Sequence, residues 1–210
     1  MIRVLIADDH PLLRNGLKNV LLQEPGFGPT GEAENADQAL EQIGQKPWDV
    51  IVLDIGMPGR NGLETLAEIK KVRPHLPVLI LSMHSEQQFA LRAIKAGASG
   101  YMSKSEAPAE LIRAIRRVLE GKRYVSAALA EVLANAVESG EERPLHEALS
   151  DREYHVMCRI ASGKTVSEIA GETSLSVKTI STYRARALEK MNMRTNADLT
   201  RYAIRNLLVD

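Results

Sequence analysis

The stretch IVLDIGMPGRNG, residues 51–62, leads an apolar run into the carboxylate of Asp54 and then breaks up into glycines and a proline. Burying a carboxylate at the end of such a run is costly unless its charge is compensated. The run DVIVLD (49–54) is apolar on both faces, which is typical of a strand buried in a parallel sheet. We therefore expect a compensating cation beside Asp54, with the following glycines allowing the backbone to curl close to it.

Working outward, the first part of the chain alternates apolar runs with amphipathic stretches. The predicted strands are RVLIA (3–7), TGEA (30–33), DVIVLD (49–54), PVLILS (77–82) and GYMS (100–103). Helix patterns cover residues 11–23, 35–43, 63–72, 86–96 and 107–120. Capping signals support them: Asn35 with Gln38, Ser85 with Gln88, and Ser105 before the fifth helix, with Gly121 just past its end. Alternating strands and helices predict an α/β fold with a doubly wound, five-stranded parallel sheet.

From Tyr124 onward the pattern changes. SAALAEVLANAVESG (126–140) is an Ala-rich amphipathic helix, and the charged GEERPLHEAL (140–149) is typical of a linker. From Ser150 onward only helices are predicted. Capping-box spacing occurs at Ser150 and Glu153 and at Thr165 and Glu168, a third helix begins near Ser176, and a fourth begins at Thr195 or Asn196. The sequence thus predicts a second, all-α domain of four helices.

Composition narrows the class of protein. A chain of 210 residues is comfortable for two domains. The formal net charge is zero, so any nucleic-acid-binding surface must be local. Cys158 is the only cysteine, which excludes an internal disulfide and fits a reducing compartment. The first apolar stretch is too short for a signal peptide, and no run approaches membrane-spanning length. We expect a cytoplasmic protein with no membrane partner.

Polar groups follow the predicted strands where each one ends. Asp8 and Asp9 end the first strand, Asp54 the third and Ser82 the fourth, while Lys104 follows the fifth. Ligands of open parallel sheets bind at the carboxyl ends of the strands. Clustered carboxylates repel one another unless a cation lies among them. A single Asp at a strand end is usually a turn former or a cap, but five polar groups at one sheet edge predict a site.

A phosphoryl group on Asp54 would satisfy all of these side chains. Mg²⁺ prefers oxygen ligands, so the carboxylates and the carbonyl of Gly56 are its expected ligands. Lys104 and the Ser82 hydroxyl would then face the remaining phosphoryl oxygens, and carboxylates can accept phosphoryl groups. His10 and His84 lie near this edge, and we interpret both as solvated histidines.

Four segments carry a resemblance to a known family. LIADDHPLLRNGL, DVIVLDIGMPGRNGLE, PVLILSMHS and KAGASGYMSKS resemble the receiver domain of bacterial two-component response regulators, over residues 1–121. The resemblance implies a flavodoxin-like fold. It also implies that the domain catalyses phosphoryl transfer to itself from a sensor histidine kinase and the later hydrolysis of that phosphoryl group. It makes Asp54 the phosphoacceptor, Asp9 a direct Mg²⁺ ligand and Asp8 a ligand largely through water. It also makes Lys104 the phosphate partner, Ser82 the switch hydroxyl and Tyr101 the switch aromatic.

The helix predicted from Val177 has two distinct faces on a helical wheel. Its apolar face contains Val177, Ile180, Ala187, Leu188 and Met191. Opposite these lie Lys178, Thr182, Ala185, Arg186 and Glu189, with Thr179 and Ser181 on the flanks and Arg184 nearer the apolar side. A small, polar and basic face suits the major groove of DNA, although a solvated helix in a plain bundle has the same appearance.

A second resemblance decides between these two interpretations. LSDRE, IASGKTVSEIA, LSVKTISTYRARALEKM and RTNADL resemble the LuxR-type helix-turn-helix, over residues 147–210. It implies that the DNA-facing positions are Lys178, Thr179, Ser181, Thr182 and Ala185, with Thr165 and Arg184 near phosphates, and that the last helix forms a dimer contact. Ser181, Tyr183 and Ser167 depart from the usual lysine, histidine and lysine, which leaves the operator preference open. Residues 122–146 are the predicted helical or flexible linker.

Together the two resemblances imply a NarL/FixJ-type transcription regulator. Its expected partners are a sensor histidine kinase, a double-stranded DNA operator and a second copy on DNA, with Mg²⁺ as cofactor. An alternative is a regulator that binds DNA independently of phosphorylation under the control of a partner protein. A phosphatase that passes through an aspartyl-phosphate is disfavoured, because such enzymes need a second Asp where this chain has Gly56.

Overall fold

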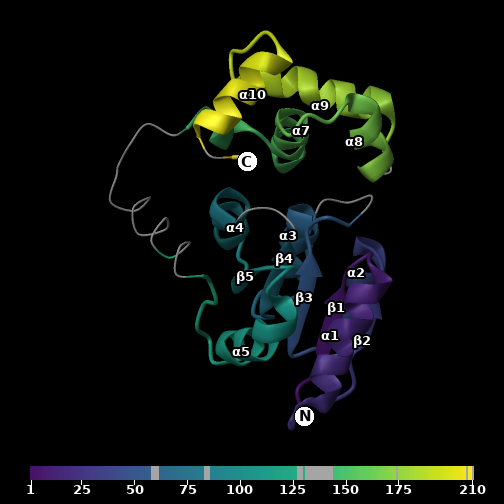
Figure 1. Ribbon diagram of the computed structural model, residues 1–210. Coiled ribbons are helices and arrows are strands. Elements are labelled where there is room, and N and C mark those ends of the chain that lie inside the picture. Colours follow the sequence, from purple (N-terminus) through teal and green to yellow (C-terminus); the bar gives the residue numbers. More distant parts are fainter. Residues whose placement is uncertain are drawn as a thin grey trace. The chain divides into compact units, whose positions relative to one another are not determined.

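The computed structural model describes residues 1–57, 62–82, 86–126, 130, 144–173, 175–206 and 208–209. The chain divides into two compact units, residues 1–136 and 137–210. In Figure 1 the first unit runs from purple to teal and the second from green to yellow.

The first unit is built on a five-stranded parallel sheet (Figure 1). Its strands are β1 (Val4–Ala7), β2 (Gly31–Ala33), β3 (Val50–Asp54), β4 (Val78–Ser82) and β5 (Gly100–Ser103). They are arranged in the order β2-β1-β3-β4-β5, and every neighbouring pair is parallel. The predicted α/β fold with a doubly wound sheet is confirmed.

Helices cover both faces of this sheet. They are α1 (Pro11–Gln23), α2 (Ala36–Gln45), α3 (Gly62–Val72), α4 (Glu86–Lys95) and α5 (Ala107–Leu119). α1 contacts α5 on one face, whereas α2 and α4 both contact α3 on the other. Leu17 of α1 and Leu111 of α5 pack with Val4, Ile6 and Val52, which are alternate residues of the strands, because successive strand side chains point to opposite faces.

The helix caps agree only in part with the predictions. Asn35 caps α2, since its side chain accepts a hydrogen bond from the Gln38 N–H at 2.9 Å. The prediction that Ser105 caps α5 is wrong, because Glu106 precedes the helix and makes no side-chain cap bond. A proline in the first turn of α5 removes one of the N–H donors that a cap would satisfy. The predicted pair Ser85 and Gln88 lies partly outside the described residues.

The chain adds a short extension to the sheet after α5. The Tyr124 N–H donates to the Ser99 carbonyl at 3.1 Å, and the Tyr124 carbonyl accepts from the Tyr101 N–H at 2.9 Å. Tyr124 is buried and belongs to the same core as α1 and α5. The first unit therefore stays ordered beyond the predicted boundary at residue 121.

The second unit consists of four described α-helices and a short 3-10 helix. They are η1 (Leu145–Ala148), α7 (Asp151–Ala161), α8 (Val166–Thr173), α9 (Val177–Lys190) and α10 (Asn196–Arg205). The predicted capping box of Ser150 and Glu153 is confirmed, and Thr195 forms another with Asp198. Its core includes Val156, Ile160, Ile169 and Ile180.

η1 packs on this helical unit although it lies largely within the predicted linker. His146 is buried, and its Nδ1 lies 2.8 Å from the Tyr202 hydroxyl of α10. Its ring also stands edge-on to that of Tyr202, with 5.8 Å between centroids. These contacts hold η1 against α10 at the start of the helical unit.

Candidate functional site

The polar groups that end the strands converge at one edge of the sheet. Asp8 directly follows β1, Asp54 and Ser82 are the last residues of β3 and β4, and Lys104 directly follows β5. All four are buried. Because the carboxyl ends of parallel strands meet at one edge, the sequence placed these groups together correctly.

Lys104 is the cation that compensates Asp54. Its Nζ lies 2.6 Å from Oδ2 of Asp54 and 2.8 Å from Oδ2 of Asp8. The other oxygen of Asp54 accepts a hydrogen bond from the Gly56 N–H at 2.7 Å. Both oxygens of the buried carboxylate are thus partnered, which explains how an acid is tolerated at the end of an apolar strand.

The site raises the affinity of Asp54 for a proton. Burial raises the pKa of Asp54 to about 6, with a further contribution from the charge of Asp8, and Lys104 only partly opposes this. Burial also lowers the pKa of Lys104, but Asp54 and Asp8 outweigh it, so this pKa ends above its usual value. The lysine is therefore a permanent cation, while Asp54 has the unusual basicity that is common in functional sites.

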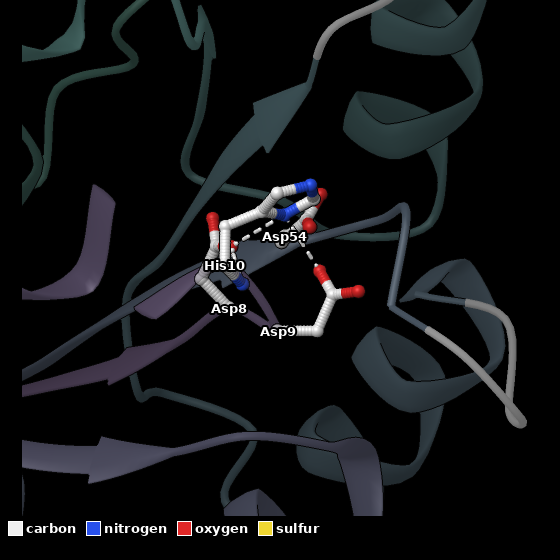
Figure 2. Close-up of side chains that lie close together, drawn as sticks. All are labelled: Asp8, Asp9, His10 and Asp54. Carbon is white, nitrogen blue, oxygen red and sulfur yellow. Dashed lines mark hydrogen bonds and ion pairs between the residues drawn. The ribbon is translucent and has the colours of Figure 1, made fainter. Parts of the chain in front are cut away.

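The carboxylates form a group that fits a divalent cation. Asp8, Asp9, His10 and Asp54 each place one potential ligand atom within 4.8 Å of the others (Figure 2). Oδ2 of Asp8 and Oδ1 of Asp9 are buried and accept no hydrogen bond, although each has an ion-pair contact. Buried carboxylate oxygens that lack hydrogen-bond donors suit a hard cation.

Arg14 is a residue of this region that the sequence reasoning missed. It lies on the buried side of α1, and its Nη1 donates to the Asp8 carbonyl at 2.7 Å. Its Nη2 bonds Glu34 at 3.0 Å. A buried arginine must be paired, so its position on the apolar face of the helix from residue 11 was the available signal. Arg14 fixes the backbone that carries Asp8.

The two predicted switch residues are both buried. Ser82 is fully buried at the end of β4, and its carbonyl accepts a hydrogen bond from the Lys104 N–H at 2.8 Å. Tyr101 is also fully buried. The ring of Tyr101 thus already lies inside the protein in this structure.

The surface of α9 largely follows the helical wheel. Exposed residues are Lys178, Ser181, Thr182, Ala185 and Arg186, while Thr179 and Arg184 are half-buried. Ile180, Ala187 and Met191 are buried as expected. The prediction that Val177 joins them is wrong, since Val177 is 51% exposed. It occupies the first position of the helix, which lies beyond the packed turns.

Several predicted DNA-binding residues on or next to α8 and α9 make hydrogen bonds with their side chains. Nε of Arg184 donates to Oδ1 of Asn196, the first residue of α10, at 2.5 Å. The Thr182 hydroxyl donates to the Lys178 carbonyl at 2.9 Å. Thr165 forms the predicted capping box with Glu168 at the start of α8. Among the described residues, no side chain pairs with Lys178 or Arg186, so both present a positive charge on the exposed face of α9.

Comparison with known families accounts for both units. Residues 4–116 match the response regulator receiver domain, and residues 147–203 match the bacterial regulatory proteins of the luxR family. The chain belongs to the response regulators. The predicted NarL/FixJ type is confirmed, and the regulator controls transcription through a phosphorylated receiver and a LuxR-type DNA-binding domain.

Relatives match this regulator over nearly its whole length. Response regulator UvrY of Escherichia coli K12 is 35% identical over 207 residues, which are 98% of this chain and 95% of that protein. Response regulator GacA of Pseudomonas aeruginosa is 34% identical over 211 residues, covering 100% of this chain and 99% of that protein.

Solved structures agree. RcsB of Salmonella typhimurium matches 96% of this chain and 98% of its own, with 26% identity and a TM-score of 0.63. RcsB bound to the promoter rprA in the presence of phosphomimetic BeF3⁻ matches with 25% identity, a TM-score of 0.65, and coverage of 96% of this chain and 97% of its own. Among the described helices of the regulator, none is long and apolar enough to cross a membrane.

Proposed function

We propose that Asp54 is the phosphoacceptor of the regulator and that a sensor histidine kinase supplies the phosphoryl group. The observation that carries this proposal is the buried Asp54 carboxylate with Lys104 Nζ at 2.6 Å and Asp8 beside it. In the transfer, an Asp54 oxygen attacks phosphorus and an O–P bond forms. The N–P bond of the donor phosphohistidine breaks, and its imidazole nitrogen keeps the electron pair and takes a proton.

The surrounding residues have distinct roles in this proposal. Lys104 holds a phosphoryl oxygen by charge, and the Ser82 hydroxyl hydrogen-bonds another. Mg²⁺ held by Asp8, Asp9, Asp54 and the Gly56 carbonyl would neutralise charge on the phosphoryl group. Tyr101, packed beside Ser82's strand, transmits the change to the surface. The same groups support self-catalysed transfer and hydrolysis, which makes the receiver a phosphorylation switch and not a conventional enzyme.

We further propose that α9 reads DNA in the major groove. Lys178, Thr179, Ser181, Thr182 and Ala185 face base edges, with Arg186 beside them, and Thr165 and Arg184 lie near phosphates. Solved structures of RcsB include a complex with DNA and two RcsB dimers bound to two parallel DNAs. By analogy, this regulator binds a double-stranded operator as a homodimer, in the cytoplasm. We also propose that the receiver domain spans residues 1–121 and that the DNA-binding domain spans residues 147–210.

Labelling with a small-molecule phosphodonor tests the phosphoacceptor. The full chain is incubated with the phosphodonor and Mg²⁺, and intact mass is measured. We expect one added phosphoryl group on the wild type and none on Asp54→Asn. Asp49→Asn is the matched control, because Asp49 pairs with Arg3 at 2.9 Å and ends no strand of the site. Undiminished labelling of Asp54→Asn would contradict the assignment, and an unlabelled wild type that still binds DNA would favour phosphorylation-independent control by a partner protein.

A further inference from the structure

His10 presents a nitrogen atom to the carboxylate cluster, and the proposed function makes no use of it. Its Nδ1 lies 2.8 Å from an Asp9 oxygen and 3.1 Å from an Asp8 oxygen. In Figure 2 dashed lines join the imidazole ring to the carboxylates of Asp8 and Asp9. His10 therefore belongs to the same site as the three carboxylates and faces it with Nδ1.

Polar contacts hold this orientation, since Nδ1 of His10 lies within hydrogen-bond distance of Oδ1 of Asp8 and 3.4 Å from Nζ of Lys104, the cation that a bound metal ion would have to displace from Nδ1. His10 directly precedes α1, but its side chain makes no cap hydrogen bond. Its side chain is 63% exposed, so the ring has room to turn toward water, yet Nδ1 points at two carboxylates. The His10 N–H also donates to the Asp8 carboxylate at 2.8 Å, which fixes the backbone from which the ring projects. Our interpretation of His10 as a merely solvated histidine is therefore incomplete.

The spacing of the four groups suits a single ion. One donor atom each from Asp8, Asp9, His10 and Asp54 lies within 4.8 Å of the others. Ligands of one ion are at most about 4–5 Å apart when each metal–ligand bond is about 2.0–2.5 Å long. The imidazole can therefore join the carboxylates as a ligand with only a small shift of side chains.

The chemical identity of the fourth donor matters for metal choice. Mg²⁺ prefers oxygen ligands and loses its water reluctantly, so an imidazole adds little to its binding. First-row transition ions accept imidazole nitrogen readily, with affinity rising from Mn²⁺ through Co²⁺ to Ni²⁺. The difference in affinity between transition-metal ions and Mg²⁺ is therefore larger for three carboxylates with one imidazole than for carboxylates alone.

We propose that His10 is the nitrogen ligand of the metal site and that it makes the site bind a first-row transition-metal ion more tightly than Mg²⁺. This inference rests on the proposed function, because it uses the same three carboxylates. It adds a residue, His10, and a class of ion to that site.

Metal titration of the full chain tests the inference without measuring phosphorylation. Binding of Mg²⁺ and of Co²⁺ is measured by calorimetry in phosphate-free buffer, and the visible absorption of bound Co²⁺ reports its ligands. The variants are His10→Ala and His10→Gln, with circular dichroism as the check of folding. His75→Ala is the matched control, because His75 is exposed and precedes β4 at the opposite edge of the sheet. Asp54→Asn tests the carboxylate part of the site.

We expect both His10 variants to bind Co²⁺ about tenfold or more weakly and to shift its absorption band, while Mg²⁺ affinity changes by less than about twofold. His75→Ala should bind both ions as the wild type does. If the His10 variants keep the wild-type Co²⁺ affinity and spectrum, His10 is not a ligand and the inference is overturned. In that case a loss of Mg²⁺ binding in Asp54→Asn would still support the proposed function. If Asp54→Asn binds both ions normally, the cluster is not the metal site and both proposals fail.

Discussion

Asp54 and Lys104 form a buried ion pair that Asp8 shares. Asp54 is buried and each of its oxygens has a partner, while Lys104 Nζ bridges Asp54 and Asp8 at 2.6 and 2.8 Å. Two carboxylates share one buried ammonium, so the site carries excess negative charge when no metal is bound. That imbalance favours binding of a cation, and its cost to the fold should be measurable in the absence of metal.

The pKa of Asp54 predicts how stability changes with pH. The pKa is about 6 in the folded chain against an ordinary value of 3.8, so the folded state holds the proton more tightly than the unfolded state. Stability should therefore fall as pH rises from about 3 to about 7, by about 3 kcal/mol in total. Asn at this position does not titrate. In EDTA, the advantage in unfolding free energy of Asp54→Asn over wild type should be about 2.5 kcal/mol larger at pH 7 than at pH 4.

For Asp49→Asn we expect the opposite change of unfolding free energy with pH. Denaturant titrations at each pH measure both variants. The hydrogen bond from Arg3 lowers the pKa of Asp49, so this acid stabilises the fold above its unfolded pKa and loses that contribution as pH falls. Asp49→Asn should therefore be less stable than wild type at pH 7, with a smaller difference in acid. If the difference in unfolding free energy between Asp54→Asn and wild type does not change with pH, the pKa of Asp54 is the same in the folded and unfolded states.

Removal of the Lys104 charge should be strongly destabilising. Lys104→Met leaves Asp8 and Asp54 buried without their cation, and breaking such a pair costs about 3–5 kcal/mol. The loss should shrink in acid, where Asp54 is protonated, and in excess Mg²⁺, which replaces the missing charge. Chemical denaturation at pH 7, with EDTA and then with Mg²⁺, measures both effects.

Lys70→Met is the control for this variant. Lys70 is half-buried and donates to the Leu76 carbonyl at 2.8 Å, so its loss removes a hydrogen bond to a neutral group. Its cost should be smaller and should not respond to Mg²⁺. A Lys104→Met variant as stable as wild type in EDTA would show that Asp54 does not need this cation.

At the scale of elements, backbone hydrogen bonds join β5, the strand that carries Tyr101, to the segment that follows α5. Gly100 of β5 lies directly against Tyr124, and a Cβ at Gly100 would stand 2.7 Å from the Tyr124 carbonyl oxygen. The neighbouring Tyr101 N–H donates to that same carbonyl. The strand that carries Tyr101 and the segment after α5 are thus held together by backbone contact, which only glycine at residue 100 permits.

Gly100→Ala should separate these two segments. The added methyl group meets backbone that cannot yield easily, so we expect a loss of about 1–3 kcal/mol in unfolding free energy. Gly44→Ala is the control, because nothing lies within 4 Å of its added Cβ in α2. An alanine there should stabilise the helix by roughly 0.5–1 kcal/mol. Thermal or chemical unfolding measures both, and equal stability of Gly100→Ala and wild type would show that this edge contact is dispensable.

The exposed face of α9 should determine DNA binding. Lys178→Ala should weaken binding by about 1–3 kcal/mol if the lysine reads bases, and by a smaller, sequence-independent amount if it contacts only phosphate. Thr182→Ala should change base preference more than affinity. Gel-shift titrations at matched salt on operator and unrelated DNA measure the difference.

Lys46→Ala controls for the change in net charge, since Lys46 is exposed and follows α2 in the receiver. It should bind DNA as the wild type does. Wild-type binding by both Lys178→Ala and Thr182→Ala would place the DNA-reading face elsewhere.

At the scale of the whole molecule, the two units have separate cores. One core joins α1 and α5 to the sheet, and the other joins α7, α8 and α9. Each unit should therefore fold alone, and phosphorylation must act through the linker or through association. A single LuxR-type domain offers a small DNA contact, whereas two domains on a pseudo-palindrome bind with a large effective concentration. We therefore expect dimerisation to be the point of control.

The isolated fragment 144–210 should bind DNA without a phosphodonor. It keeps η1, and with it the contact between His146 and Tyr202. The full-length regulator should bind weakly until it is phosphorylated, because a single DNA-binding domain offers a small contact, and its dimer fraction should rise in step with binding. Gel shifts of the fragment and of the full chain with and without phosphodonor, with sedimentation in parallel, measure both effects.

Two results would contradict this scheme. Unphosphorylated full-length regulator that binds as tightly as the fragment would show that the receiver does not restrain DNA binding. Tighter binding on phosphorylation without a change in mass would exclude dimerisation as the switch.

The sequence by itself determined the strands, most helices and the residues at the strand ends. These features depend on local chemistry: apolar runs, capping pairs such as Ser150 and Glu153, and a parallel topology that brings the carboxyl ends of strands to one edge. Asp8, Asp54, Ser82 and Lys104 were therefore predicted to meet before any contact was known.

Only the tertiary structure decided which neighbours these residues have. Arg14 bonds the backbone of Asp8, Nδ1 of His10 turns toward the carboxylates, and Tyr124 extends the sheet beyond the predicted boundary. Val177 fits the apolar stripe of its helix but is exposed, because the first turn projects beyond the packed core. Periodicity assigns a residue to a face of an element, whereas burial and pairing depend on what other elements place against that face.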